Sequence, residues 1–201
     1  MAGLRERKKE KTRRSIQQEA LKLFARQGYE ATTVDQIAEA AEISPSTFFR
    51  YFATKEDVVI QDDYDPVMIE IFLAQPAGLN PVAALRRTLR ELIDAMGPAE
   101  KEELLLRARL QLATPALRAR LLTSQTSTVN TLSAAVAQRT GRDEDDLEVQ
   151  AFTGAVIGCI LPALARWVSS EGKASFPELA EICLAQLESG FANLSPGWDP
   201  P

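Results

Sequence analysis

Apolar residues recur at intervals of three and four along nearly the whole chain, and no stretch alternates apolar and polar residues. Spacings of three and four place side chains on one face of an α-helix, whereas alternation is typical of a half-buried strand. Glycine, proline and capping residues divide the pattern into segments of ordinary helix length. The sequence therefore predicts an all-α protein.

Capping signals in the first quarter of the chain mark two short helices separated by a tight turn, after a longer helix expected over 12–27. Thr33 and Gln36 have the spacing of a capping box, which starts a helix over 34–41. Ser44 followed by Pro45 is a strong start for a second short helix. Two short helices joined by such a turn predict a helix-turn-helix, and an ordinary helical corner is the alternative.

The pattern of this region separates an inward set of residues from an outward set. The inward residues are apolar: Ile37, Ala38, Ala41, Ile43, Phe48 and Phe52. The residues left at outward or boundary positions are Ser44, Ser46, Thr47, Phe49, Arg50 and Tyr51. Exposed aromatic side chains next to an arginine are expected to have a binding partner, which favours the helix-turn-helix over the corner.

Residues 12–58, and above all TTVDQIAEAAEISPSTFFRYFATKEDV at 32–58, resemble the DNA-binding domain of tetracycline-repressor (TetR) family transcriptional regulators. The resemblance implies an N-terminal three-helix DNA-binding domain and a larger helical domain that binds a small molecule and dimerises. For most members it also implies repression that the small molecule relieves. Glu42 stands where the family often has glycine, and Pro45 stands where lysine or arginine is frequent.

The resemblance also implies a set of contacts with double-stranded operator DNA. Recognition-helix positions that face base edges or nearby phosphates are occupied by Ser44, Ser46, Thr47, Phe49 and Arg50. Phosphate-contact positions are occupied by Thr33, Tyr51 and Lys55. The chemistry agrees, because arginine can bind guanine O6 and N7 together, and a lysine at a helix N-terminus adds charge where phosphate is already attracted.

The charge of the chain changes sign along its length. Residues 1–55 contain 11 Lys and Arg against 7 Asp and Glu, whereas residues 56–201 contain 12 against 21. A basic first quarter on an acidic remainder fits a protein that meets a polyanion through its first quarter only. Seven of the 11 positive charges precede Ser15, so a solvated basic tail would produce the same count.

Thr54 is expected to cap a fourth helix that ends near Gln61, with Asp57 at the third position after the cap. Beyond this helix, the apolar pattern together with proline, glycine and capping residues predicts the remaining helices. They are expected at about 65–74, 81–96, 100–114, 114–140, 146–169 and 177–191. A capping box at Ser175 and Glu178 is expected to open the last one. We therefore expect a helix-turn-helix DNA-binding domain at 1–55 and an all-helical effector-binding and dimerisation domain at 56–201.

Residues 123–131, in the middle of the longest expected helix, place hydroxyl and amide side chains on all sides of that helix. One interpretation is a cavity for a small-molecule effector, and the other is a helix that its neighbours only half cover. The residues expected to line the cavity are Leu89, Arg107, Gln125, Thr128, Leu132 and Phe152.

The segments PVAALRRTLREL at 81–92 and TPALRARLL at 114–122 resemble a branch of the family that includes mycofactocin-system regulators. Some members of that branch respond to acyl thioesters. The resemblance implies a long apolar or amphipathic effector, with Arg107 or Arg109 near an anionic group. A surface position for either arginine is the alternative.

The last two expected helices are the helices that form the four-helix bundle of the dimer in TetR-family proteins. The residues assigned to this interface are Phe152, Val156, Cys159, Ile182, Leu187 and Phe191. Small residues at 154, 155, 158 and 163 suit close helix approach, although a purely intramolecular core would contain them too. A homodimer is favoured because a palindrome is read by two copies.

The absence of histidine limits the chemistry of the chain. Histidine acid–base catalysis and most zinc and non-haem iron sites are excluded, and no nucleophile motif or phosphate loop occurs, so neither an enzyme nor a metal or cofactor is expected. Cys159 and Cys183 lack CxxC spacing and are expected to be buried thiols. A DNA-binding protein with a vestigial pocket, regulated by a protein partner, is the alternative to an effector-controlled repressor.

The sequence also leads to an expectation about location. No apolar run approaches the roughly 18 residues of a membrane-spanning helix. The first 14 residues are charged throughout and lack the apolar part of a secretory signal. We expect a cytoplasmic protein with no membrane partner.

Overall fold

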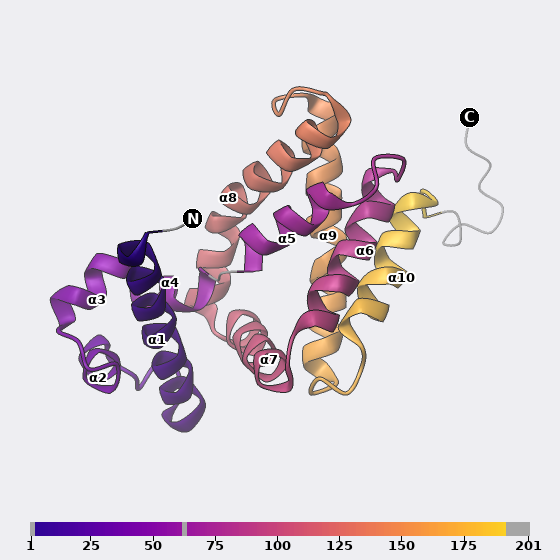
Figure 1. Cartoon of the computed structure of the whole chain (residues 1–201). Helices are drawn as coiled ribbons and strands as arrows, with labels where there is room; N and C mark the ends of the chain where they lie inside the picture. The colour runs from indigo at the N-terminus through magenta and orange to yellow at the C-terminus, as the bar shows by residue number, and fades with distance from the viewer. Residues whose placement is uncertain (1–2, 62–63, 192–201) are drawn as a thin grey trace. The chain divides into compact units, whose positions relative to one another are not determined.

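The structure is a computed structural model that describes residues 3–61 and 64–191, without the side chains of residues 4, 5 and 121–128 (Figure 1). All regular elements of this described part are α-helices, as expected. Their bounds are α1 Leu4–Gln27, α2 Val34–Ala40, α3 Pro45–Tyr51, α4 Lys55–Ile60, α5 Tyr64–Ala74, α6 Pro81–Ala95, α7 Pro98–Ala113, α8 Pro115–Thr140, α9 Leu147–Ser169 and α10 Phe176–Glu188.

The chain forms two compact units. Unit 1 comprises residues 1–62 and 106–123, and unit 2 comprises residues 63–105 and 124–201. The bounds of α7 and α8 cross these divisions, so each of the two helices contributes residues to both units.

Unit 1 is built on α1 to α4, which surround a core of aromatic and branched side chains. The buried members include Ile16, Phe24, Ile37, Phe48, Phe52, Val58 and, from α8, Leu117. Three of the helices begin where the sequence places a cap. The Thr33 hydroxyl accepts from the Gln36 backbone N–H, and the Thr54 hydroxyl accepts from that of Asp57. These hydrogen bonds join residues that are close in the chain, and they mark the N-termini of the short helices.

The turn between α2 and α3 contains a residue in the left-handed backbone region. Glu42 has φ of 54°, and the Ile43 N–H donates to the Ala38 carbonyl at 2.9 Å, which closes the C-terminus of α2. Glycine favours this conformation and glutamate does not. The departure from the family pattern at Glu42 is therefore accommodated at a cost in backbone strain.

Unit 2 has its own core, in which α10 packs against α9 and α6, and α5 packs against α6. Its buried members include Phe72, Leu85, Leu132, Val136, Val149, Val156, Cys159 and Leu184. Arg139 of α8 closes the C-terminus of α5, because its guanidinium donates to the carbonyls of Gln75 at 3.0 Å and Leu79 at 3.0 Å. Its cationic group also lies 5.5 Å from the centroid of the Phe72 ring.

Three local expectations are corrected. Helix α1 begins at Leu4 and not near Thr12, because the Lys, Arg and Glu residues before Thr12 have high helix propensity. Ser175 precedes α10, but its side chain makes no capping hydrogen bond. Pro177 has no N–H, which removes one of the two donors that a capping side chain accepts from. Helix α10 ends at Glu188, three residues before Phe191.

The expectation that no segment approaches the length of a membrane-spanning helix is wrong for α9. It has 23 residues and is long and apolar enough, by length and composition, to cross a membrane. The core helices of water-soluble proteins meet the same criteria. In the structure α9 packs along α10 and buries Val149, Val156 and Ala163, while 28% of its apolar 18-residue stretch is buried within the described chain.

Candidate nucleic-acid interface and effector domain

The N-terminus of α3 carries three hydroxyls that are linked to one another. The Ser44 hydroxyl accepts from the Thr47 backbone N–H at 3.1 Å. The same oxygen lies 2.9 Å from the Ser46 hydroxyl and 2.9 Å from the Thr47 hydroxyl. Ser44 and Ser46 are exposed, so this end of α3 presents oriented hydroxyls and helix N-terminal N–H groups to the surroundings.

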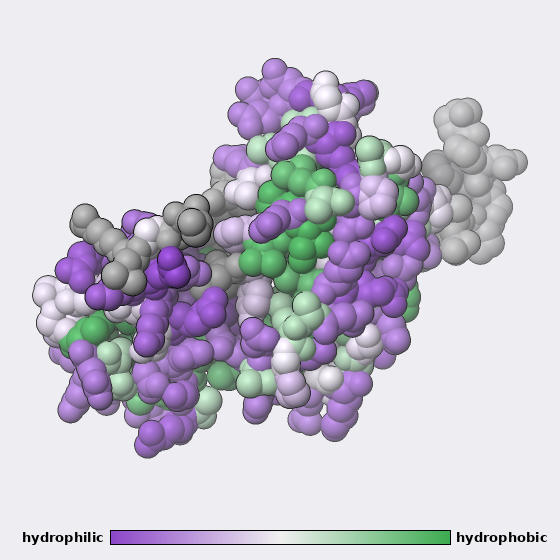
Figure 2. All heavy atoms as spheres, in the orientation of Figure 1, coloured by the Kyte–Doolittle hydropathy of each residue, from purple (hydrophilic) through white to green (hydrophobic). Residues whose placement is uncertain are grey.

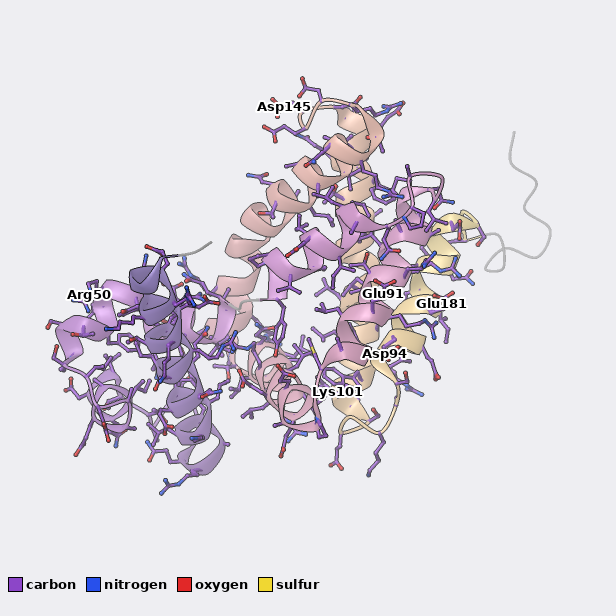
Figure 3. All side chains as sticks on the ribbon, viewed as in Figure 1. Arg50, Glu91, Asp94, Lys101, Asp145 and Glu181 are labelled. Carbon is purple, nitrogen blue, oxygen red and sulfur yellow. The ribbon has the colours of Figure 1, made fainter. Side chains whose placement is uncertain are left out.

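Phe49 and Arg50 extend from the outer side of α3. Phe49 is 55% exposed and packs edge-on against the buried ring of Phe48, with the ring centroids 5.4 Å apart. Arg50 is exposed, and its guanidinium lies 5.5 Å from the centroid of the Tyr51 ring. Figure 3 shows Arg50 at the edge of unit 1, away from the core. Such an orientation leaves the guanidinium available to a base edge or a phosphate.

Lys55 has a structural role that the sequence did not reveal. Its ammonium group donates to the carbonyls of Tyr29 at 2.9 Å and Thr32 at 3.0 Å, and it lies 4.1 Å from the centroid of the Tyr29 ring. These hydrogen bonds of Lys55 therefore link the start of α4 to the loop before α2, next to Thr33, which is a predicted phosphate contact. The phosphate contacts of both residues remain predictions.

The neighbouring pair Tyr29 and Glu56 strengthens the same junction. The Tyr29 hydroxyl donates to Glu56 Oε1 at 2.8 Å. Burial raises the pKa of Tyr29, and the hydrogen bond to Glu56 raises it further. Burial would raise the pKa of Glu56 as well, but hydrogen bonds from its backbone N–H, Tyr29 and Thr54 outweigh burial and lower it. Tyr29 thus stays a neutral donor and Glu56 an ionised acceptor.

Side chains of α7 and α8 that belong to unit 1 bind both halves of α4. Buried Arg107 donates to the Val58 carbonyl at 3.0 Å and to the Val59 carbonyl at 2.9 Å, and Gln111 donates to the latter at 3.2 Å. Arg120 of α8 pairs with buried Asp57 at 2.9 Å. The local sequence indicates only the capping position of Asp57, because Arg120 is 63 residues away in the chain.

The residues expected to line an effector cavity are divided between the units. Arg107 lies in unit 1, where its guanidinium holds α4, whereas Leu89, Leu132 and Phe152 belong to or pack against the core of unit 2. The side chains of Gln125 and Thr128 lie outside the described residues. The assignment of these residues to one cavity remains a prediction.

The core of unit 2 contains three buried hydroxyls that the sequence analysis did not single out. Thr88 donates to the Ala84 carbonyl at 2.8 Å, Thr153 donates to the Val149 carbonyl at 2.8 Å, and Ser133 lies 3.2 Å from the Thr153 hydroxyl. Hydroxyls on helices are commonly satisfied by the carbonyl four residues earlier. They can also rotate toward a polar group of a ligand.

Hydrophobic side chains also reach the surface of unit 2. Figure 2 shows them gathered around α5, where Val67 is exposed and Ile69 and Leu73 are partly buried. A separate open cleft of about 580 Å³ lies beside the nearly buried rings of Trp167 and Phe176. Its lining includes Asp94 and Lys101, so the cleft has no uniform charge for an anionic ligand.

The residues expected at a dimer interface fall into two groups. Val156 and Cys159 are buried in the core of the single chain, and Phe152 and Leu187 pack against that core. Ile182 and Phe191 are 60% and 42% exposed. Burial raises the pKa of the Cys159 thiol, and nearby Cys183 raises it further, so the thiol is poorly reactive.

The exposed side of α9 is lined by small residues. Gly154 and Gly158 are exposed, and a Cβ added to either would meet no atom within 4 Å among the described residues. Ala151, Pro162 and Ala165 are exposed at helical spacing from these glycines. A second helix could approach this side of α9 closely.

Comparison with known proteins identifies relatives for both parts of the chain. A family model described as bacterial regulatory proteins of the tetR family matches residues 16–61, and one described as the MftR C-terminal domain matches residues 79–192. The HTH-type transcriptional regulator TcmR of Streptomyces glaucescens is 35% identical over 201 residues, which cover 96% of this chain and 87% of that protein. The regulator MftR of Mycobacterium tuberculosis is 30% identical over 172 residues, 82% of this chain and 84% of that protein.

Comparison with solved structures also identifies transcriptional regulators with a similar fold. The Thermus thermophilus FadR, described as a TetR family transcriptional repressor in complex with lauroyl-CoA, is 26% identical with a TM-score of 0.57 and covers 94% of this chain and 100% of its own. FadR from Bacillus subtilis is 22% identical with a TM-score of 0.59, covers 88% of this chain and 97% of its own, and supports the fold. With a capped helix-turn-helix, a separate helical unit and matches across both, the chain belongs to the TetR family of transcriptional regulators.

Proposed function

We propose that the protein is a homodimeric repressor that reads a palindromic operator through α3 and leaves it when an acyl thioester binds in unit 2. The observation that supports DNA reading best is the exposed pair Phe49 and Arg50 on a helix whose N-terminus is capped by Ser44. Phe49 presents an apolar ring to the surroundings. It can contact a thymine methyl group while Arg50 binds a guanine.

The effector class rests on one relative and on the composition of unit 2. The Thermus thermophilus FadR structure holds lauroyl-CoA. In this chain, the buried residues of unit 2 are mainly apolar, and hydroxyls such as those of Thr88 and Thr153 lie among them. An acyl chain would take the place of contacts that the apolar side chains around Leu89, Leu132 and Phe152 make with one another. A Thr88 or Thr153 hydroxyl that rotates could donate to the thioester carbonyl. The apolar surface around α5 offers an entrance for such a chain.

We propose that α7 and α8 couple effector binding to release from DNA, since both helices contribute residues to both units. Arg120, in the unit 1 part of α8, is paired with Asp57 of α4. Ser133, in the unit 2 part of the same helix, contacts Thr153 in the core. An effector that displaces the second part of α8 would alter the support of α4. Only its differential affinity for the two states can lower DNA affinity.

DNA reading is tested by comparing Arg50→Ala with Lys55→Ala on the duplex that wild-type protein enriches from a random pool, and on random DNA. Arg50→Ala should weaken binding to the enriched duplex by about 1 to 3 kcal/mol and relax specificity. Lys55→Ala should weaken binding to both DNAs and reduce the salt slope by about one. Equal specificity ratios for wild type and Arg50→Ala would contradict the role of Arg50.

The effector is tested by titrating lauroyl-CoA, with coenzyme A and lauric acid as controls, into protein bound to the enriched duplex. A coupling of about 1 to 3 kcal/mol would weaken DNA binding roughly 5- to 150-fold, and DNA would weaken lauroyl-CoA binding by the same factor. DNA binding that lauroyl-CoA leaves unchanged would contradict the acyl thioester. If a metabolite library also fails to change thermal stability, regulation by a protein partner becomes the better explanation.

A further inference from the structure

The first turns of α1 form a strongly basic helical segment that the proposed function does not use. Residues 5–14 contain seven Lys and Arg and two Glu, and the structure shows that they continue α1 rather than form a separate tail. Arg7, Lys11 and Arg14 are spaced by four and three residues, so they share one face of the helix. They line an open groove of about 450 Å³ together with Glu10, Ser15 and Gln18.

The helical segment that carries this basic face lies next to the DNA-reading helix inside unit 1, which it contacts through Arg13 on another side of α1. The Arg13 guanidinium lies 5.2 Å from the centroid of the Phe52 ring, and Phe52 is the C-terminal cap of α3. Arg13 also donates to the Gln61 side chain at 3.3 Å, just beyond α4. The third turn of α1, which carries Arg13, therefore lies beside the C-terminal end of α3 (Figure 1).

We propose that Arg7, Lys11 and Arg14 bind the phosphates of duplex DNA that flanks the half-site read by α3. Arg7 to Arg14 span about 10 Å along α1, which corresponds to about three phosphates of one strand. Phosphate contacts of this kind position the protein and add affinity without reading sequence. The inference rests on the proposed function and extends its DNA contact beyond the recognition helix.

A duplex fits this segment better than a membrane surface does. Helices that lie on membranes bury an apolar face in the lipid while their basic face meets the headgroups. Residues 5–14 contain no apolar side chain.

The test uses the full chain with Arg7→Gln, Lys11→Gln and Arg14→Gln combined. The control combines Arg87→Gln, Arg166→Gln and Lys173→Gln, which remove the same charge from exposed positions of unit 2. Each protein is titrated over a range of salt concentrations against three duplexes. These are the enriched palindrome alone, the palindrome with about ten added base pairs on each side, and random DNA of the longer length.

On the longer palindromic duplex, the α1 variant should reduce the salt slope by about 0.9 for each lost phosphate contact, or about 2 to 3 in total. Its preference for the palindrome over random DNA should be unchanged. Wild-type protein should bind the longer duplex more tightly than the palindrome alone, and the α1 variant should lose this difference. The control variant should behave as wild type in all three respects.

Equal salt slopes for the α1 variant and wild type, or equal losses for the α1 and control variants, would overturn the proposal. The same holds if the α1 variant loses binding to phosphatidylglycerol vesicles while its DNA binding is unchanged. Wild-type protein that fails to prefer any palindrome contradicts the proposed function instead. In that case the salt slopes on random DNA still decide whether α1 binds phosphates.

Discussion

Arg120 donates to buried Asp57 Oδ1 from Nε at 3.2 Å and from Nη2 at 2.9 Å. The other carboxylate oxygen of Asp57 accepts from the Thr54 backbone N–H at 3.1 Å. Asp57, a residue that is 2% exposed, therefore both caps the N-terminus of α4 and pairs with Arg120 of α8. The geometry makes Asp57 a junction between the DNA-binding helices and the segment of α8 that supports them.

Arg120→Met should lower the free energy of unfolding by about 1 to 3 kcal/mol, because it leaves a buried carboxylate without its cation. Arg118→Met is the matched control, since Arg118 is exposed on the same helix. Its effect should stay within about 0.5 kcal/mol. Urea denaturation of both variants measures the difference, and equal midpoints would mean that the pair contributes nothing to stability.

Glu42→Gly should raise the free energy of unfolding by up to about 1 kcal/mol. The substitution relieves the strain of a φ of 54°, which costs a non-glycine residue about 1 to 2 kcal/mol, and part of the gain is offset by the greater freedom of glycine in the unfolded chain. Glu42→Ala keeps the strain and should not stabilise. Thermal denaturation compares the two variants, and similar melting temperatures would show that the backbone at this turn is unstrained.

The Arg86–Glu181 pair between α6 and α10 should make stability depend on pH. The hydrogen bond from Arg86 lowers the pKa of Glu181 below its usual 4.5 and outweighs the effect of burial. Because the folded pKa lies below the unfolded pKa, the pair stabilises the protein above about pH 4.5. That stability is lost as the pH falls through the lowered folded value.

Arg86→Met should therefore destabilise the protein near pH 7 and have less effect below pH 4. Arg87→Met is the control, because Arg87 lies 4.0 Å from Glu91 on an exposed surface. Denaturant titrations across this pH range measure both variants. A destabilisation by Arg86→Met that does not change with pH would show that packing, and not charge, accounts for it.

Gly158→Leu and Ile182→Glu should separate the proposed dimer into folded monomers. Both positions are exposed in the single chain, so neither change disturbs its core, but a second helix could no longer approach α9 closely and a charge would enter the interface. Operator affinity should fall with the dimerisation constant. Sedimentation and circular dichroism are the measurements, and variants that remain dimeric would place the interface elsewhere.

Gly172→Ala provides a contrast in the same unit. A Cβ at Gly172 would lie 2.7 Å from Leu105 Cδ2, and its φ is 77°. This variant should destabilise the fold and leave the proposed dimer contacts of α9 and Ile182 unchanged. Comparing it with Gly158→Leu distinguishes loss of the interface from loss of structure.

The sequence by itself determined the features that depend on neighbours in the chain. The caps Thr33, Ser44 and Thr54 each bond a backbone N–H three residues later, so their spacing could be read directly. The apolar intervals of three and four likewise predicted the helices and the inward side of the helix-turn-helix. Phe49 and Arg50 were expected to face outward for the same reason, and they do.

Only the tertiary structure decided the partners of the long polar side chains. Arg107 resembled a candidate for an anionic effector, yet it binds carbonyls 48 and 49 residues away in α4. Arg139 binds carbonyls 64 and 60 residues away, just beyond the end of α5. A flexible guanidinium can reach acceptors in any direction, so its local sequence does not specify which carbonyl or carboxylate folding will bring to it.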